Sequence, residues 1–142
     1  LAIAGGTRIK TTLSFPTPEN YPQAYIWLKE QKADAILEYP VYTWADQNHG
    51  YEMVRMLYSS LHGKSLINGA SGFMPKERDV LLAEIITDYP TMRLNQVLKE
   101  MGVDFVIVHK DEVGNEKITE FESDERLKKV WEDSKISVYS LN

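Results

Sequence analysis

Several polar side chains stand beside apolar segments of the sequence, and Glu38 is the clearest of them. It lies inside a largely apolar stretch, where burial raises the pKa of a carboxyl group unless a partner is present. Arg55, His62 and Lys64 are the partners that the sequence offers. A glutamate that meets a histidine can transfer protons as acid and base. A structural ion pair or an exposed edge position is the simpler explanation of the same residue.

The loop around Ser71 is a second place where chemistry is conceivable. Gly69-Ala70-Ser71-Gly72 is similar to the nucleophile elbow Gly-x-Ser-x-Gly, but its second glycine comes one residue early. The elbow also needs a helix directly after the serine, and Phe73-Met74-Pro75 intervenes. A structural turn is therefore favoured over a serine hydrolase.

Other polar positions complete the set of candidate ligand-binding residues. His62 follows a predicted helix, where a histidine is more often a partner of the helix dipole than a catalyst. Asn68 and His109 each follow a predicted strand. No residue is assigned as catalytic. The candidate ligand-binding residues are Glu38, His62, Asn68, Ser71 and His109.

Motifs for metals and cofactors are not found. The chain has no cysteine, and its histidines lack the spacing of zinc ligands. The segment 46–50 is faintly similar to a calcium loop, but the twelfth position, which requires glutamate, is Leu57. Gly5-Gly6-Thr7 does not fit a phosphate loop, and no dinucleotide fingerprint occurs. The sequence therefore predicts no metal site and no cofactor.

The composition is that of one globular domain. The 142 residues are 43% hydrophobic and 26% charged, and 16 basic against 21 acidic side chains give a net charge of −5. A nucleic-acid binder needs a basic face, so we expect no nucleic-acid partner. No segment reaches the roughly 20 apolar residues of a membrane-spanning helix. The start Leu1-Ala2-Ile3, without an initiator methionine, favours a piece cut from a longer polypeptide.

Hydrophobic periodicity predicts the strands and helices that position these residues. Asn20 and Thr91 are the expected helix N-caps, and Gly63 and Gly102 the expected C-terminal stops. The inward stripes of the second and third helices are expected at Met53, Val54, Leu57 and Leu61, and at Val80, Leu81, Ile85 and Ile86. Strands are predicted over 7–15, 35–41, 65–68 and 103–108, and helices over 21–30, 52–61, 75–88 and 91–101.

The C-terminal part is predicted to contain a charged loop over 110–117 and one helical turn over 123–126. A hairpin then pairs 127–131 with 136–141, because the strand-forming Val138 and Tyr139 need a partner. A helix over 124–131 followed by a single strand is the alternative.

The alternation of strands and helices predicts an α/β domain of three layers. We expect a mainly parallel sheet with helices on both faces and an antiparallel terminal hairpin at one edge. Residues 1–17 are an extended lead-in with a possible edge strand, and residues 18–142 form the single domain. In such sheets ligands bind outside the carboxyl ends of the strands, where Glu38, Asn68 and His109 lie.

The order of short motifs provides a further inference. The chain resembles, over 18–141, the C-terminal extracytoplasmic domain of bacterial polytopic membrane proteins similar to GT-C glycosyltransferases. That class uses lipid-linked sugar donors. The motifs that carry the resemblance are Tyr25-Ile26-Trp27-Leu28, Ala35-Ile36-Leu37-Glu38-Tyr39-Pro40-Val41, Tyr58-Ser59-Ser60-Leu61-His62-Gly63-Lys64, Ile67-Asn68-Gly69-Ala70-Ser71-Gly72-Phe73, and the run 98–109.

The resemblance implies a domain at the extracytoplasmic face of the cell membrane. In the GT-C class the catalytic acid and the donor site lie among the membrane helices, so no catalytic residue transfers to this chain. The implied role is non-catalytic: glycan or acceptor binding, or support of the membrane part. The implied partners are the transmembrane part of the same parent chain and a glycan or lipid-linked sugar.

Two other functions remain open from the residues themselves. One is a protein-interaction module that docks through aromatic side chains near Trp44 and Tyr51. The other is a free-standing enzyme, in which Glu38 acts as acid or base with His62 or His109.

Overall fold

Five strands form one mixed sheet in this computed structural model, which describes residues 17–69 and 76–141. The strands are β1 (Ala35–Tyr39), β2 (Ser65–Leu66), β3 (Val103–His109), β4 (Lys128–Glu132) and β5 (Ile136–Ser140). Their order across the sheet is β2-β1-β3-β5-β4. β1 runs parallel to β2 and β3, and β5 runs antiparallel to β3 and β4. The predicted α/β class and the terminal hairpin at one edge are confirmed.

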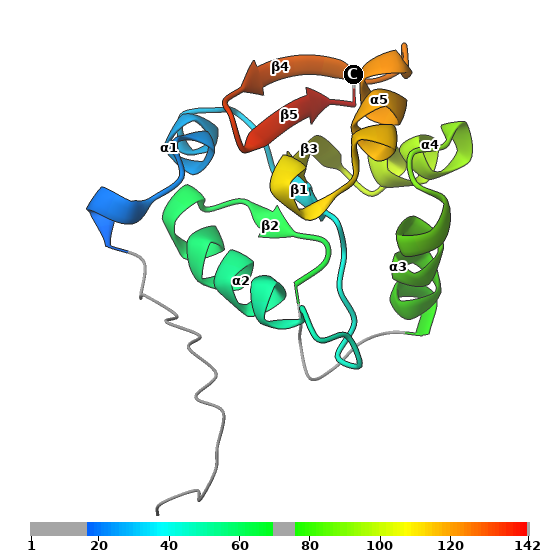
Figure 1. The fold of residues 1–142 in the computed structure, drawn as a ribbon, viewed down its shortest axis with the longest axis horizontal. Helices are drawn as coiled ribbons and strands as arrows, with labels where there is room; N and C mark the ends of the chain where they lie inside the picture. Colours follow the sequence, from blue (N-terminus) through cyan, green and yellow to red (C-terminus); the bar gives the residue numbers. More distant parts are fainter. Residues whose placement is uncertain (1–16, 70–75, 142) are drawn as a thin grey trace, which may run out of the picture.

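Helices cover both faces of this sheet. They are α1 (Gln23–Lys29), α2 (Gly50–His62), α3 (Lys76–Asp88), α4 (Met92–Glu100) and α5 (Asn115–Ser123), with short 3-10 turns η1 (Pro18–Asn20) and η2 (Lys110–Glu112). α1 and α2 lie on one face, and α3, α4 and α5 lie on the other (Figure 1). The three predicted layers are therefore present. None of the described helices combines the length and the apolar character needed to cross a membrane.

Strand β1 shows how the two faces are divided. All five of its residues are buried, and successive side chains point to opposite faces. Leu37 and Tyr39 join the apolar cluster beneath α3, α4 and α5. Ile36 joins the cluster beneath α1 and α2, and Glu38 points to the same side, where it contacts Tyr25 of α1. A carboxylate thus stands where the pattern of the sheet asks for an apolar side chain.

The ends of the helices follow local sequence rules in most places. The Thr91 hydroxyl accepts a hydrogen bond from the Leu94 N–H and caps α4, as predicted. Gly63 and Gly102 follow α2 and α4 with φ of +70° and +85°, a left-handed conformation that glycine adopts without a Cβ clash. The predicted Asn20 cap is wrong, because Asn20 ends η1 and Pro22 occupies the N-cap of α1.

The orientation of α2 overturns part of the predicted inward stripe, since Val54 and Leu61 are partly buried but Met53 and Leu57 are not. Met53 and Leu57 are 45% and 49% exposed, whereas Glu52, Arg55 and His62 are buried. Glu38 explains why polar residues of α2 are buried, because a buried carboxylate needs polar partners from the helix that packs on it. The polar residues of α2 recur at helical spacing and therefore share the buried face. The buried side of the helix is therefore turned toward its polar residues, and of the predicted stripe Leu61 still packs against the apolar cluster.

Other expectations are corrected in smaller ways. On α3, Leu82 and Ile85 are buried, while Val80 and Ile86 are exposed. The predicted loop over 110–117 and turn over 123–126 are replaced by η2 and α5, which buries Phe121. The hairpin is confirmed over the alternative helix. The strand predicted over 7–15 lies outside the described residues.

Candidate functional site

A buried polar cluster lies between β1, α1 and α2, with Glu38 at its centre. The Glu38 side chain is fully buried. Its Oε2 accepts a hydrogen bond from the Tyr25 hydroxyl at 2.6 Å and lies 2.6 Å from His109 Nε2. Arg55 Nε is 3.5 Å from the same oxygen. Strands β1 and β3 are adjacent and parallel, so their carboxyl ends bring Glu38 and His109 together.

Arg55 connects this glutamate to two further carboxylates. Its Nη1 donates to Glu52 Oε1 at 3.0 Å and to the Pro40 carbonyl at 2.6 Å. Its Nη2 donates to Glu112 Oε1 at 2.7 Å. The guanidinium carbon also lies 5.4 Å from the centre of the Tyr42 ring. The planar fork of donors suits this role, since each nitrogen reaches a different acceptor.

Asn68 holds the cluster to the backbone of β1. Its Oδ1 accepts from the Glu38 N–H, and its Nδ2 donates to the Glu38 carbonyl, both at 3.1 Å. The same Nδ2 donates to Glu52 Oε2 at 2.7 Å. The Asn68 amide is therefore engaged at both ends, which fits a positioning role rather than contact with a ligand.

The electrostatics of the cluster follow from burial and pairing. Burial acts to raise the pKa of Glu38, but hydrogen bonds from His109 and Tyr25 and the charge of Arg55 outweigh it and lower the pKa. Burial raises the pKa of Glu52. Burial acts to lower the pKa of Arg55, and its neighbouring carboxylates raise it overall. Glu38 thus stays ionised at neutral pH as the partner of a charged guanidinium.

His62 stands close to the cluster without a hydrogen bond to Glu38. Its ring lies 5.4 Å from the Tyr25 ring, and its Nδ1 accepts from the Lys64 N–H at 3.0 Å. Burial lowers the pKa of His62, which matches a neutral ring with an acceptor at Nδ1. His62 Nε2 and Glu38 Oε1 are buried and have no hydrogen-bond partner among the described residues.

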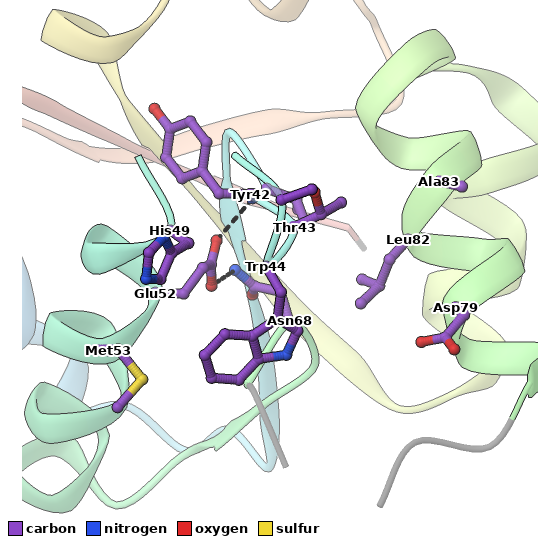
Figure 2. A pocket seen from close by; sticks show the side chains of 12 residues that line it. Tyr42, Thr43, Trp44, His49, Glu52, Met53, Asn68, Asp79, Leu82 and Ala83 are labelled. Atoms are coloured by element: carbon purple, nitrogen blue, oxygen red, sulfur yellow. Dashed lines mark hydrogen bonds between the residues drawn. The ribbon is translucent and has the colours of Figure 1, made fainter. Parts of the chain in front are cut away.

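Beside the cluster, a cavity of about 370 Å³ opens between α2 and α3. Figure 2 shows Met53 and Glu52 on one wall, Leu82 and Asp79 on the other, and the Trp44 ring between them. Glu52 reaches the cavity from the cluster, as does Asn68. The cavity lies beyond the carboxyl end of β1, where α/β sheets bind ligands.

A second cavity, of about 320 Å³, lies on the other side of Arg55. Tyr25, Arg55 and His109 form its inner part. Tyr51 and Tyr58 of α2 supply aromatic walls. Glu38 lines neither cavity, because its neighbours cover it.

The structure therefore joins part of the predicted set. Glu38, Asn68 and His109 meet in one cluster, and His62 lies beside it. Ser71 lies outside the described residues. No group of three potential metal ligands occurs within 17–69 and 76–141.

Sequence reasoning named Arg55 only as one possible partner and missed Tyr25, Glu52 and Glu112. One signal was present for α2. Glu52, Arg55 and His62 are spaced by three and seven residues, which puts them on one face of a helix. Glu112 carries no comparable signal, because it belongs to a short turn after β3.

Comparison with known proteins gave no match, either to a protein-family model or to a curated protein.

Proposed function

We propose that this chain is a non-catalytic glycan-binding domain at the extracytoplasmic face of a membrane protein similar to the GT-C glycosyltransferases. The ligand is a glycan or the sugar part of a lipid-linked sugar. The observation that carries the proposal is the cavity between α2 and α3, where the exposed indole ring of Trp44 lies across from the Asp79 carboxylate, which no other described residue pairs with (Figure 2).

The chemistry of the cavity walls suits a sugar ring. Trp44 is 62% exposed, and an indole offers a flat apolar face on which the C–H face of a sugar can stack. No described residue forms a hydrogen bond or ion pair with the Asp79 carboxylate, so it is available to accept from sugar hydroxyls. Apolar walls with a few convergent polar groups are typical of small-molecule sites.

The cluster around Glu38 supports a non-catalytic role. A general acid or base must reach the proton that it transfers. Glu38 is fully buried, lines neither cavity and already accepts from Tyr25. Its lowered pKa also makes it a poor proton donor at neutral pH. These features favour a structural ion pair, which positions α2 and the walls of the cavity.

The proposal is tested by titrating the chain with soluble oligosaccharides: mannotriose, maltotriose and chitotriose. We expect one of them to bind by calorimetry and to change the fluorescence of Trp44. Asp79→Asn should weaken binding about tenfold, the size expected for loss of one charged hydrogen bond. Trp44→Ala should weaken it at least as much.

Met92→Ala is the matched control, because Met92 is exposed on α4 and does not line the cavity. It should leave binding unchanged. Absence of binding to all three oligosaccharides at millimolar concentration would contradict glycan binding. Release of cleaved sugar during the titration would contradict the non-catalytic role.

A further inference from the structure

The two cavities differ in the charge of their walls. The cavity on the far side of the polar cluster is lined by Arg55, Lys135 and His109 together with carboxylates. Among the described residues, no lysine or arginine lines the cavity between α2 and α3, whereas Glu52 and Asp79 both do. The second of these cavities therefore offers an anionic ligand no partner of that kind.

Most polar side chains of this cavity present hydrogen-bond acceptors. The Asp79 carboxylate forms no hydrogen bond or ion pair with any described residue. Glu52 Oε2 accepts one hydrogen bond, from Asn68 at 2.7 Å, and a carboxylate oxygen can accept two. His49 Nδ1 lies 2.9 Å from the Asp46 carbonyl oxygen, which assigns the proton to Nδ1 and makes Nε2 of the neutral ring an acceptor. A ligand that supplies donors fits these walls.

Carboxylates also outnumber cations along the inner wall. Three carboxylates of the polar cluster share the single guanidinium of Arg55. His109 can add one positive charge at most, and Asp79 adds a further negative charge. The first turns of α2 and α3 both contain acidic residues, so the positive ends of these helices already have negative partners. The excess of negative charge favours a positively charged ligand.

An organic ammonium group fits the cavity better than a metal ion. A metal ion needs several converging ligands, and no group of three potential ligands occurs within 17–69 and 76–141. An ammonium group donates up to three hydrogen bonds and is attracted to the face of an indole ring. Trp44 is 62% exposed and lies across the cavity from Asp79 (Figure 2). The walls therefore offer an ammonium group both an ion pair and a cation–π contact.

We infer that the ligand of this cavity is a sugar with a free, protonated amino group, which Asp79 and Trp44 select over neutral sugars. The inference deepens the proposed function and rests on it for the sugar part of the ligand. Asp79 is the specificity-determining residue, because its carboxylate is the one without a partner among the described residues. An N-acetylated amine has no charge and should bind less tightly.

A matched pair of trisaccharides tests this selection. Chitotriose and its fully deacetylated form, the glucosamine trimer, differ in their nitrogen groups alone. Calorimetry on the full chain at about pH 6.5, where such an amine is mostly protonated, should show about tenfold tighter binding of the glucosamine trimer. Raising the salt concentration from about 0.02 M to about 0.5 M should reduce this preference, because salt screens an ion pair with an exposed carboxylate.

Variants in the first turn of α3 separate the cavity carboxylate from the charge of the whole chain. Asp79→Asn should reduce the preference to about twofold, the part that the cation–π contact supplies. Asp79→Glu keeps the charge and should restore part of the preference. Glu77→Gln is the matched control, because Glu77 is an exposed acid of the same turn and lines neither cavity. It should keep the full preference, and all three variants should keep the urea midpoint of the parent chain.

Two results would overturn the inference while glycan binding itself stands. One is equal binding of chitotriose and the glucosamine trimer, and the other is a preference that Asp79→Asn and Glu77→Gln reduce equally. Binding of cyclohexylamine as tightly as the trimer would overturn the inference and the proposed glycan ligand together, because no sugar would be needed. Absence of binding by the glucosamine trimer and by all three neutral oligosaccharides would also contradict both.

Discussion

The two faces of the sheet bury different kinds of side chain. Beneath α3, α4 and α5 the core is apolar and aromatic, with Leu37, Leu98 and Phe121 fully buried. Beneath α1 and α2, an apolar half around Ile36 and Leu28 continues into the polar cluster around Glu38. The same sheet thus has a conventional core on one side and a network of ion pairs on the other.

The difference separates what stabilises the fold from what shapes the site. Burial of apolar side chains is the main favourable term in folding, and the α3–α5 face supplies it. A buried ion pair is often no more stabilising than apolar residues of similar volume. The polar cluster is therefore hard to explain by stability alone. Its members Glu52, Arg55 and His109 line the two cavities, which links the cluster to the proposed site.

Removing the one guanidinium of the cluster should give the largest effect. Arg55→Met leaves the carboxylates of Glu38, Glu52 and Glu112 without their shared cation. We expect a loss of about 3–5 kcal/mol in the free energy of unfolding, measured by urea denaturation. Arg93→Met removes the exposed pair with Glu84 and should cost less than about 1 kcal/mol. Similar losses of unfolding free energy in Arg55→Met and Arg93→Met would show that the buried cluster contributes no more to stability than an exposed ion pair.

A cavity in the apolar face should have a smaller but substantial effect. Leu98→Ala removes a fully buried side chain of α4 and should cost about 3 kcal/mol in the same urea experiment. Oligosaccharide binding by the folded protein should remain unchanged, because Leu98 lines neither cavity. If Leu98→Ala kept its stability but lost oligosaccharide binding, the proposed division would be wrong, in which the α3–α5 face stabilises the fold and the α1–α2 face shapes the site.

The smallest expected effect is a change in the pH dependence of stability. It should arise from His62, on the α1–α2 face of the sheet. Burial lowers the pKa of His62, although the Glu38 carboxylate opposes this shift. Between the lowered value and about 6.5, the unfolded chain binds more protons than the folded chain, so stability falls as pH falls. His62→Gln should make the urea midpoint less sensitive to a change from pH 7.5 to pH 5.5.

His49→Gln is the matched control, because His49 is exposed. It should keep the pH sensitivity of the parent chain, and Leu98→Ala should lower stability equally at both pH values. An unchanged pH response in His62→Gln would argue against a buried neutral imidazole at this position.

The strands and their pairing could be predicted from the sequence where the pattern of apolar residues determines them. The run from Val103 to Val108 predicted a strand covered on both faces, and β3 occupies the centre of the sheet. Val138 and Tyr139 predicted the pairing of β5 with β4. In these segments the pattern, the burial and the local propensity agree.

The sequence-based predictions are wrong where polar residues are buried, and where an element contributes few residues to the core. The apolar stripe of α2 was wrong at Met53 and Leu57, because the identity of the facing strand residue, Glu38, decides which side turns inward. Helix α5 was missed because Phe121 is the single buried residue among many charged ones. Sequence spacing placed Glu38 and Asn68 at strand ends. It did not reveal the pairing with Arg55, which depends on how two distant elements pack.

The Asn68 side chain has a consequence for how the chain behaves among its neighbours. β2 pairs with β1 at Ala35 and Ile36, and within 17–69 and 76–141 no strand lies beside the rest of β1 on that side. The Asn68 amide imitates a peptide group and occupies both hydrogen-bonding groups of Glu38. An open row of such groups is a template on which another chain can add a strand and begin to aggregate. One asparagine thereby closes the edge that a two-residue strand leaves exposed.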